Sequence, residues 1–366
     1  MKNVTRRGFI GLSASAALAA ALAGCSSGGS SASSSASSAS ASSEAASSSA
    51  ASSSASASAS AAASAAASAG ALRFVTGGES GTYYAFGSVI AQHATNNAGL
   101  DVTALVGNGS AANIAELEDG NAELAFCQSD VMAYAFEGSE QWKSLGSGAP
   151  VTCYSTVAAL YDETVQIVTC NPDIKTVEDL KGKNVSIGAA GSGVYFNAID
   201  ILGAYGLAEA DINPTFESFA DTANSIKDGK IDAGFVVAGA PTTAITELST
   251  SKQAYLVALD KEHVDQLVAA SPYYSAATIP AGTYSGIDED IATVSVQAVI
   301  LANDTVAEDD VYKLVADIFD NASSLVETHA KYGEIDLDKG ASITTVPYHP
   351  GAAKYFGEKG KTVTTK

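Results

Sequence analysis

The succession of an apolar run, a loop rich in glycine or serine, and a helical pattern constrains the fold of this chain most strongly. The first unit has a strand-like run at 72–75, a loop with three glycines, and apolar residues at helical spacing from Phe86 onward. Two further units follow, with strands expected at 101–106 and 122–127, a helix at 111–119 and a second helix that ends at Gly138. Such repetition predicts a parallel α/β sheet, in which ligands bind at the carboxyl ends of the strands.

The first loop, Thr76–Tyr84, has the composition of a ligand-binding turn. Its glycines at 77, 78 and 81 lead to Thr82, which we expect to cap the helix. The N-terminus of a helix presents free backbone N–H groups and the positive end of a dipole, which suits an anionic group. A tight turn that binds nothing is the alternative.

The second loop matches a known motif by spacing alone. Gly107, Gly109 and Ala112 fit the dinucleotide fingerprint, and Asp130 lies about where a ribose-binding acid would be. However, the flanking strands are the second and third of the unit, and the helix is short for that motif. A turn in which Ser110 caps the helix and Asn113 faces the loop is the simpler interpretation.

The second half of the chain repeats the α/β pattern. We expect strands at 151–160 and 165–170, interrupted at 161–164 by a crossing between lobes. A glycine loop at 189–193 follows a strand and places Ser192 at a helix N-terminus, where it caps the helix or binds a ligand. The remaining expectations are strands at 184–188, 234–238, 254–259 and 293–303, helices up to 205, at 219–227 and at 309–328, and an irregular connection at 272–284.

The amino terminus reads as an export signal followed by a tether. Residues 1–25 contain Arg6-Arg7, an apolar run and Leu-Ala-Gly-Cys, which resemble a twin-arginine signal and a bacterial lipobox with lipid on Cys25. A transmembrane anchor is the weaker alternative, because the apolar run is shorter than the ~20 residues that span a bilayer. Residues 26–70 are almost entirely Ser, Ala and Gly, which indicates a disordered tether or an O-glycosylated stalk.

The charge of the chain argues against nucleic acid as a partner. Three of the 19 basic residues lie in the signal and one of the 40 acidic residues lies in the tether, so the body from Ala71 has 16 basic and 39 acidic residues, a net charge of −23. The body contains a single arginine, Arg73. An acidic ligand must therefore be held mainly by backbone N–H, hydroxyl and amide groups.

Cysteine and histidine give no evidence of a metal or cofactor. With Cys25 assigned to lipid, Cys127, Cys153 and Cys170 remain, and pairing of Cys153 with Cys170 stays open. The four histidines are scattered without metal-ligand spacing, so we predict neither a metal site nor a cofactor.

Nine separated motifs together resemble the TAXI family of TRAP-transporter solute-binding proteins. They lie at 76–84, 109–113, 128–130, 179–183, 188–193, 229–233, 238–242, 279–284 and 349–352, in the order of the family, and cover essentially all of 72–355. Ala190 and Val194 depart from the family pattern, where proline and threonine are frequent.

The resemblance implies an α/β fold of the two-lobed periplasmic-binding-protein type II, or Venus-flytrap, class. Lobe 1 is then expected at 71–163 and 256–366, and lobe 2 at 164–255. It also implies capture of a small acidic solute, typically glutamate or 2-oxoglutarate, by lobe closure, and delivery to TRAP membrane subunits. The ligand-binding residues expected are Gly78, Thr82, Tyr83, Tyr84, Ser110, Asn113, Gln128, Ser129, Asp130, Ser192, Gly193, Gly239 and Pro241.

Two other functions remain open at this point. A substrate-binding lipoprotein of an ABC importer would have the same fold. A hydrolase would explain the serines beside glycines, but the body contains no Gly-x-Ser-x-Gly motif and no phosphate-binding loop. We therefore predict a binding protein and not an enzyme.

Overall fold

The computed structural model describes residues 70–144 and 148–366. The predicted signal, the lipid site Cys25 and the tether up to residue 69 lie outside these residues. Within the described part of the chain, no helix combines the length and apolarity that crossing a membrane requires.

Ten strands form one sheet in the order β2-β1-β3-β10-β4-β7-β5-β6, with β8 paired to β4 and β9 paired to β10. Their bounds are β1 Leu72–Val75, β2 Val102–Leu105, β3 Leu124–Gln128, β4 Tyr154–Thr169, β5 Asn184–Ser186, β6 Asn213–Thr215, β7 Ala233–Ala238, β8 Tyr255–Val257, β9 Ser275–Ile279 and β10 Ile291–Asn303. In the first half β1 runs parallel to β2 and β3. In the second half β5 runs parallel to β6 and β7.

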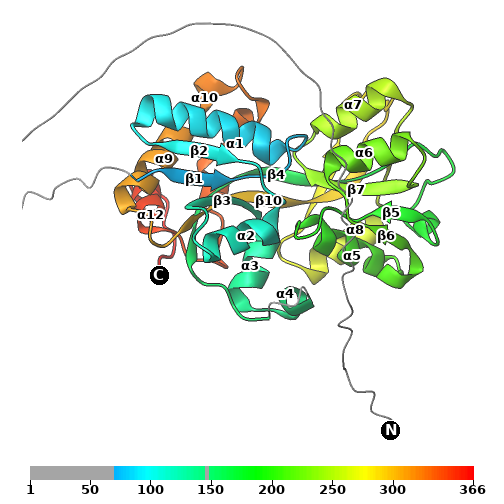
Figure 1. Cartoon of the computed structure of the whole chain (residues 1–366), viewed down its shortest axis with the longest axis horizontal. Coiled ribbons are helices and arrows are strands. Elements are labelled where there is room, and N and C mark those ends of the chain that lie inside the picture. The colour runs from blue at the N-terminus through cyan, green and yellow to red at the C-terminus, as the bar shows by residue number, and fades with distance from the viewer. Residues whose placement is uncertain (1–69, 145–147) are drawn as a thin grey trace, which may run out of the picture. The chain divides into compact units, whose positions relative to one another are not determined.

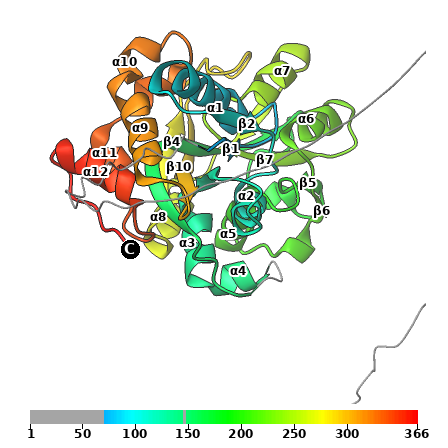
Figure 2. The same cartoon turned by 60° about the vertical axis from the view of Figure 1, so that its left-hand side comes forward.

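Helices cover both halves of the sheet (Figure 1). They are α1 Thr82–His93, α2 Ser110–Glu118, α3 Ser129–Glu137, α4 Glu140–Ser144, α5 Val194–Ala204, α6 Phe219–Lys227, α7 Thr243–Ser251, α8 Lys261–Ala270, α9 Glu308–Asp320, α10 Ala322–Leu325, α11 Leu337–Gly340 and α12 Pro350–Glu358, with the short η4 at Ala330–Glu334. Figure 2 shows α9 and α12 packed together beside the first half, and α5 and α6 beside the second. The expected α/β architecture is confirmed, because each half of the sheet contains parallel strands with helices beside them.

Strands β4 and β10 belong to both halves and run antiparallel to each other. The first part of β4 pairs with the end of β10, whereas 164–169 pairs with β7. The expected interruption of β4 at 161–164 is wrong, because β4 continues through it. Polar residues are accommodated there because Asp162 forms an ion pair with Lys339 and the adjacent Glu163 points into a cavity described below.

Two further expectations differ from the structure, and the cysteine pairing that the sequence left open is absent. Residues 275–279 form β9 within the predicted irregular connection, because their backbone pairs with β10. The predicted helix 309–328 ends at Asp320, where Asn321 leaves the helix and α10 begins. Cys153 and Cys170 are both free, and they pack against the cores of different halves.

Three clusters of buried side chains make up the core. One lies in the first half around Phe74, Phe86 and Phe126. The other two lie in the second half, and both include side chains between Val257 and Val296. We therefore propose that the chain returns to the first lobe within β10, which is later than the expected boundary at 256.

Candidate ligand-binding site

A cavity of about 220 Å³ lies where the starts of five helices meet. Its walls include the first residues or the capping residues of α1, α2 and α3 from the first half, and of α5 and α6 from the second. Each of these helices has nine or more residues. The initial N–H groups of a helix have no partner within it, and the dipole end beside them is positive. The walls therefore favour a negatively charged group.

Glycines allow these helix starts to approach one another. A Cβ on Gly193 would lie 1.5 Å from Gln128 Oε1, and a Cβ on Gly109 would lie 3.1 Å from the Ser192 backbone. Gly109 also has φ = 102°, a conformation that side chains rarely adopt. The backbone of α5 thus packs directly against the second loop, where Ala112 N donates a 2.9 Å hydrogen bond to Gly191 O.

Five side chains with an unpaired, buried polar atom line the cavity, and we call them the floor. They are Tyr83, Gln128, Tyr161, Glu163 and Ser192. Buried polar atoms in proteins are nearly always hydrogen-bonded, and each one left unpaired costs about 1–3 kcal/mol. A ligand that supplies matching partners would remove this penalty.

Glu163 gives the floor its only carboxyl group. Glu163 lies in β4 opposite Val296 of β10, next to the point where β4 passes from the first half to the second. It is 1% exposed, and its Oε1 has no hydrogen-bond partner among the described residues. Burial raises the pKa of Glu163 to about 8, and the nearby charge of Asp130 acts in the same direction. The residues that line the cavity include no Lys, Arg or His.

The orientation of Gln128 is fixed by a chain of hydrogen bonds behind the cavity. The Tyr274 hydroxyl donates to Asp200, so its oxygen is free to accept from Asn197 Nδ2. The same Nδ2 donates to Asp130 at 2.9 Å, which leaves Asn197 Oδ1 to accept from Gln128 Nε2 at 3.0 Å. Gln128 therefore keeps its carbonyl oxygen unpaired.

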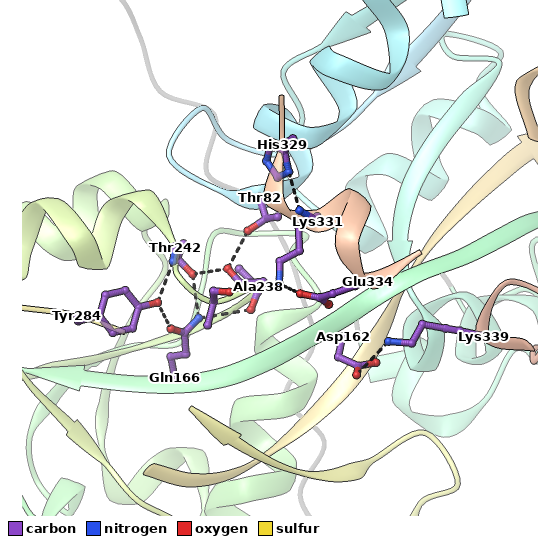
Figure 3. A network of polar contacts seen from close by, with 12 residues as sticks. Thr82, Asp162, Gln166, Ala238, Thr242, Tyr284, His329, Lys331, Glu334 and Lys339 are labelled. Atoms are coloured by element: carbon purple, nitrogen blue, oxygen red, sulfur yellow. Dashed lines mark hydrogen bonds and ion pairs between the residues drawn. The ribbon is translucent and has the colours of Figure 1, made fainter. Parts of the chain in front are cut away.

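A second set of polar contacts joins the halves beside the cavity, and we call it the clasp (Figure 3). Thr82 Oγ1 donates to Gly239 O at 3.0 Å, so it does not cap α1 as expected; the cap position belongs to Gly81. Lys331 of η4 donates to Ala240 O at 3.2 Å and pairs with Glu334. Gln166, Thr242 and Tyr284 hold the turn from the other side through mutual hydrogen bonds.

The structure brings seven of the thirteen expected site residues to the cavity. These are Gly78, Thr82, Tyr83, Ser110, Gln128, Ser192 and Gly193. Ser110 does not cap its helix by its side chain, and its Oγ accepts from Gln128 N at 3.0 Å. Ser192 does not cap α5 either, because Gly193 occupies the cap position and Ser192 Oγ is unpaired.

The other six expected residues are not among those that line it. Asn113 donates to Thr76 O and Phe126 O, which ties the ends of two strands. Ser129 accepts from Gln297 N, and Asp130 accepts from Asn197. Gly239 belongs to the clasp, Pro241 follows it in the same turn, and Tyr84 lies one residue beyond the lining part of α1.

Several lining residues were missed by the sequence reasoning. Tyr161 and Glu163 were interpreted as part of a connection, although a carboxylate between two apolar runs was a signal for a buried site. Phe219 and Val237 were placed on a helix and a strand without a role in the site. Trp142 is buried in α4 and is not among the lining residues. No cluster of possible metal ligands is present among residues 70–144 and 148–366.

Solved structures with a similar course of the chain are distant in sequence. The alkanesulfonate-binding protein SsuA from Xanthomonas axonopodis pv. citri bound to MOPS is 16% identical, with a TM-score of 0.48 over 80% of this chain and 85% of that chain. The periplasmic aliphatic sulphonate binding protein SsuA from Escherichia coli is 15% identical, with a TM-score of 0.42 over 79% and 90%. A putative L-cystine ABC transporter from Listeria monocytogenes is 14% identical, with a TM-score of 0.43 over 73% and 98%.

Sequence identities and TM-scores this low do not indicate which ligand this chain binds. A family model gives a more specific result, because it matches residues 74–360, which include every strand from β3 to β10 and the whole lining of the cavity. The chain belongs to the NMT1-like family.

Proposed function

We propose that this chain is an extracytoplasmic solute-binding protein that captures a small acidic solute and delivers it to a membrane transporter. The observation that carries the proposal is the meeting of five helix starts around one cavity whose lining, within the described part of the chain, has no cationic side chain. Glutamate, 2-oxoglutarate and related carboxylates are the solutes expected. Lipid on Cys25 would hold the protein at the outer face of the cell membrane.

Backbone groups and hydroxyls are sufficient for useful affinity. Micromolar binding corresponds to about −8 kcal/mol. Hydrogen bonds to a charged group contribute roughly 1.5–3 kcal/mol each, so four or five of them offset the cost of ordering the ligand. The Ser192 hydroxyl and the N–H groups at the starts of α1, α2 and α5 supply that number.

Closure of the two lobes would enclose the solute. The cavity takes its walls from both halves, and the clasp together with the bond from Ala112 N to Gly191 O joins them across it. A ligand that contacts both halves stabilises the closed state over the open one, and the transporter then recognises the closed form.

The TRAP class is the transporter we propose, on the strength of the nine motifs that follow the TAXI order. An ABC importer is the second candidate. Uptake of the bound solute into vesicles separates the two, since a TRAP system requires a sodium gradient and an ABC importer requires ATP hydrolysis.

Calorimetric titration of the purified protein with a panel of small carboxylates tests the binding role. We expect one ligand per chain, recovered chemically unchanged, and an affinity five- to twenty-fold lower after Ser192→Ala. Failure of every carboxylate to bind would refute the proposed function, and turnover of a bound ester would favour the hydrolase.

A further inference from the structure

Among residues 70–144 and 148–366, the Oε1 atom of Glu163 has no hydrogen-bond partner within bonding geometry, and only Tyr83 and Gln128 lie close enough to lower the pKa of this carboxyl by hydrogen bonding. A buried carboxylate is ordinarily paired with a cation or with several N–H donors. Lys331 is the nearest candidate, because its ammonium lies over the Tyr161 ring at 5.4 Å from the centroid. That ammonium is, however, bound to Glu334 and to Ala240 O.

Gln128 adds a second acceptor to the same cavity. Its Nε2 donates one hydrogen bond to Asn197, and hydrogen bonding by the same Gln128 side chain lowers the pKa of Glu163, while Asn197 Nδ2 donates to Asp130 and Tyr274. The unpaired Gln128 Oε1 can only accept a hydrogen bond. The cavity therefore contains the Glu163 carboxyl and this acceptor oxygen beside the hydroxyls of the floor, and helix starts that donate form much of its remaining wall.

This division of acceptors and donors defines the chemistry of the occupant. Helix starts suit a carboxylate, and an acidic side chain beside an amide oxygen that can only accept suits an N–H group with positive charge. We propose that the solute is an amino-bearing carboxylate and that Glu163, assisted by Gln128 Oε1, binds its ammonium group. The inference rests on the proposed function and narrows it, since it favours an amino acid over an oxo acid or a plain dicarboxylate.

Binding of an ammonium group should release a proton. Burial raises the pKa of Glu163 to about 8, so the empty site holds the proton at pH 7. The groups that face Glu163 are Tyr83 on α1, Asp130 on α3, Tyr161 on β4 and Lys331 on η4. Asp130 raises the pKa of Glu163 as burial does, whereas hydrogen bonding by Tyr83 and Gln128 and the charge of Lys331 lower it. A ligand cation favours the ionised carboxylate and expels the proton, whereas a ligand oxygen that accepts from a protonated Glu163 leaves it in place.

The first experiment compares matched ligands on the purified full-length protein. The pairs are L-glutamate with glutarate, L-aspartate with succinate, and L-norvaline with valerate, and 2-oxoglutarate is added as an oxo acid. We expect the amino member of the best-binding pair to bind about ten- to hundred-fold more tightly than its partner. Equal or tighter binding of the deaminated member would overturn the inference and leave the proposed function intact. Absence of binding by all seven would overturn both.

The second experiment measures proton release and assigns it to Glu163. Calorimetry of the best amino ligand at pH 7, in buffers of different ionisation enthalpy, should show nearly one proton released by the wild type and none by Glu163→Gln. The variant should also bind the amino ligand ten- to hundred-fold more weakly and the deaminated ligand about as well as before.

Asp162→Asn is the matched control, since Asp162 precedes Glu163 on β4 and pairs with Lys339 (Figure 3). It should retain both the affinity and the proton release. Proton release that persists in Glu163→Gln, or proton uptake by the wild type, would overturn the role of Glu163.

Discussion

The floor and the clasp are both sets of polar groups buried where the two halves meet, yet they differ in how their hydrogen bonds are satisfied. In the clasp Thr82, Thr242 and Lys331 all donate to backbone carbonyls of a single turn. In the floor Tyr83, Glu163 and Ser192 each keep an unpaired buried atom. The clasp is complete within the protein, whereas the floor is complete only with a ligand.

The difference indicates a separation of roles. Satisfied buried networks fix one arrangement of the chain, and unsatisfied ones are costly until a partner arrives. The clasp should therefore determine how stable the closed state is, and the floor should determine which solute stabilises it. Substitutions in the two regions should give different patterns of affinity and selectivity.

Gly193→Ala should have the largest effect on affinity, because Gly193 lies where the two halves are in contact. The added Cβ would lie 1.5 Å from Gln128 Oε1 and 2.9 Å from Ser110 Oγ, and Asn197 holds Gln128 in place. We expect at least a hundred-fold loss of affinity for every ligand, measured by calorimetry. Gly203→Ala, in the same helix with no neighbour within 4 Å of its Cβ, should bind normally and gain up to about 1 kcal/mol in stability. Wild-type affinity in Gly193→Ala would show that the halves do not close as described.

Glu163→Gln should reduce the pH dependence of the free energy of unfolding, and this tests the role of Glu163 in the floor. The folded-state pKa of Glu163 is about 8, above its ordinary value of 4.5, so the folded protein binds the extra proton. The stability from this group is present below pH 4.5 and is lost as pH rises through 8, by an amount on the order of 5 kcal/mol. Denaturant unfolding of the empty protein at pH 5.5 and 8.5 should show a smaller difference for Glu163→Gln than for the wild type. Asp130, whose burial raises its pKa to about 7, adds a parallel loss that remains in the variant. An unchanged difference would contradict the burial of a protonated Glu163.

Thr242→Val should have the smallest effect and should be nonselective. It removes the hydroxyl that donates to Gly239 O and accepts from Gln166 Nε2 while it retains the shape of the side chain. Because the clasp stabilises closure for any ligand, we expect affinities to fall about three- to ten-fold, or about 1 kcal/mol, equally for amino and deaminated solutes. Lys339→Met, which breaks a pair away from the clasp, should change them by less than about two-fold. A change in selectivity by Thr242→Val would remove the distinction between clasp and floor.

Local patterns predicted most of the secondary structure near the site. Phe219–Lys227 was expected as a helix with the bounds that the structure has, and the strands at 72–75 and 124–128 were placed within two residues. These elements have clear periodicity and glycine or capping residues at their ends. The interruption of β4 was predicted wrongly because Tyr161–Thr164 has the composition of a turn, and its strand pairing with β10 depends on residues more than 130 positions away.

The site was predictable where it consists of helix starts and was missed where it depends on strand pairing. Ser192 and Gly193 follow directly from a glycine loop before a helix. Asn113 and Asp130 have the same local signature, but their side chains face other strands and helices and not the cavity. Nothing in the sequence distinguishes a polar side chain that ties two strands from one that meets a ligand.

The course of β4 and β10 has a mechanical consequence. Both links between the halves are strands of one continuous sheet, paired with each other from Tyr154 to Thr164 and irregular in register near Ala298 and Ile300. Opening of the two halves must therefore twist this pair of strands, because the halves are not joined by flexible loops. Because both strands keep their hydrogen bonds, the pair favours one angle between the halves. Amide hydrogens where β4 and β10 pair should therefore exchange slowly in both the ligand-free and the ligand-bound protein. Amide hydrogens of the Gly239 turn should exchange more slowly when ligand is bound.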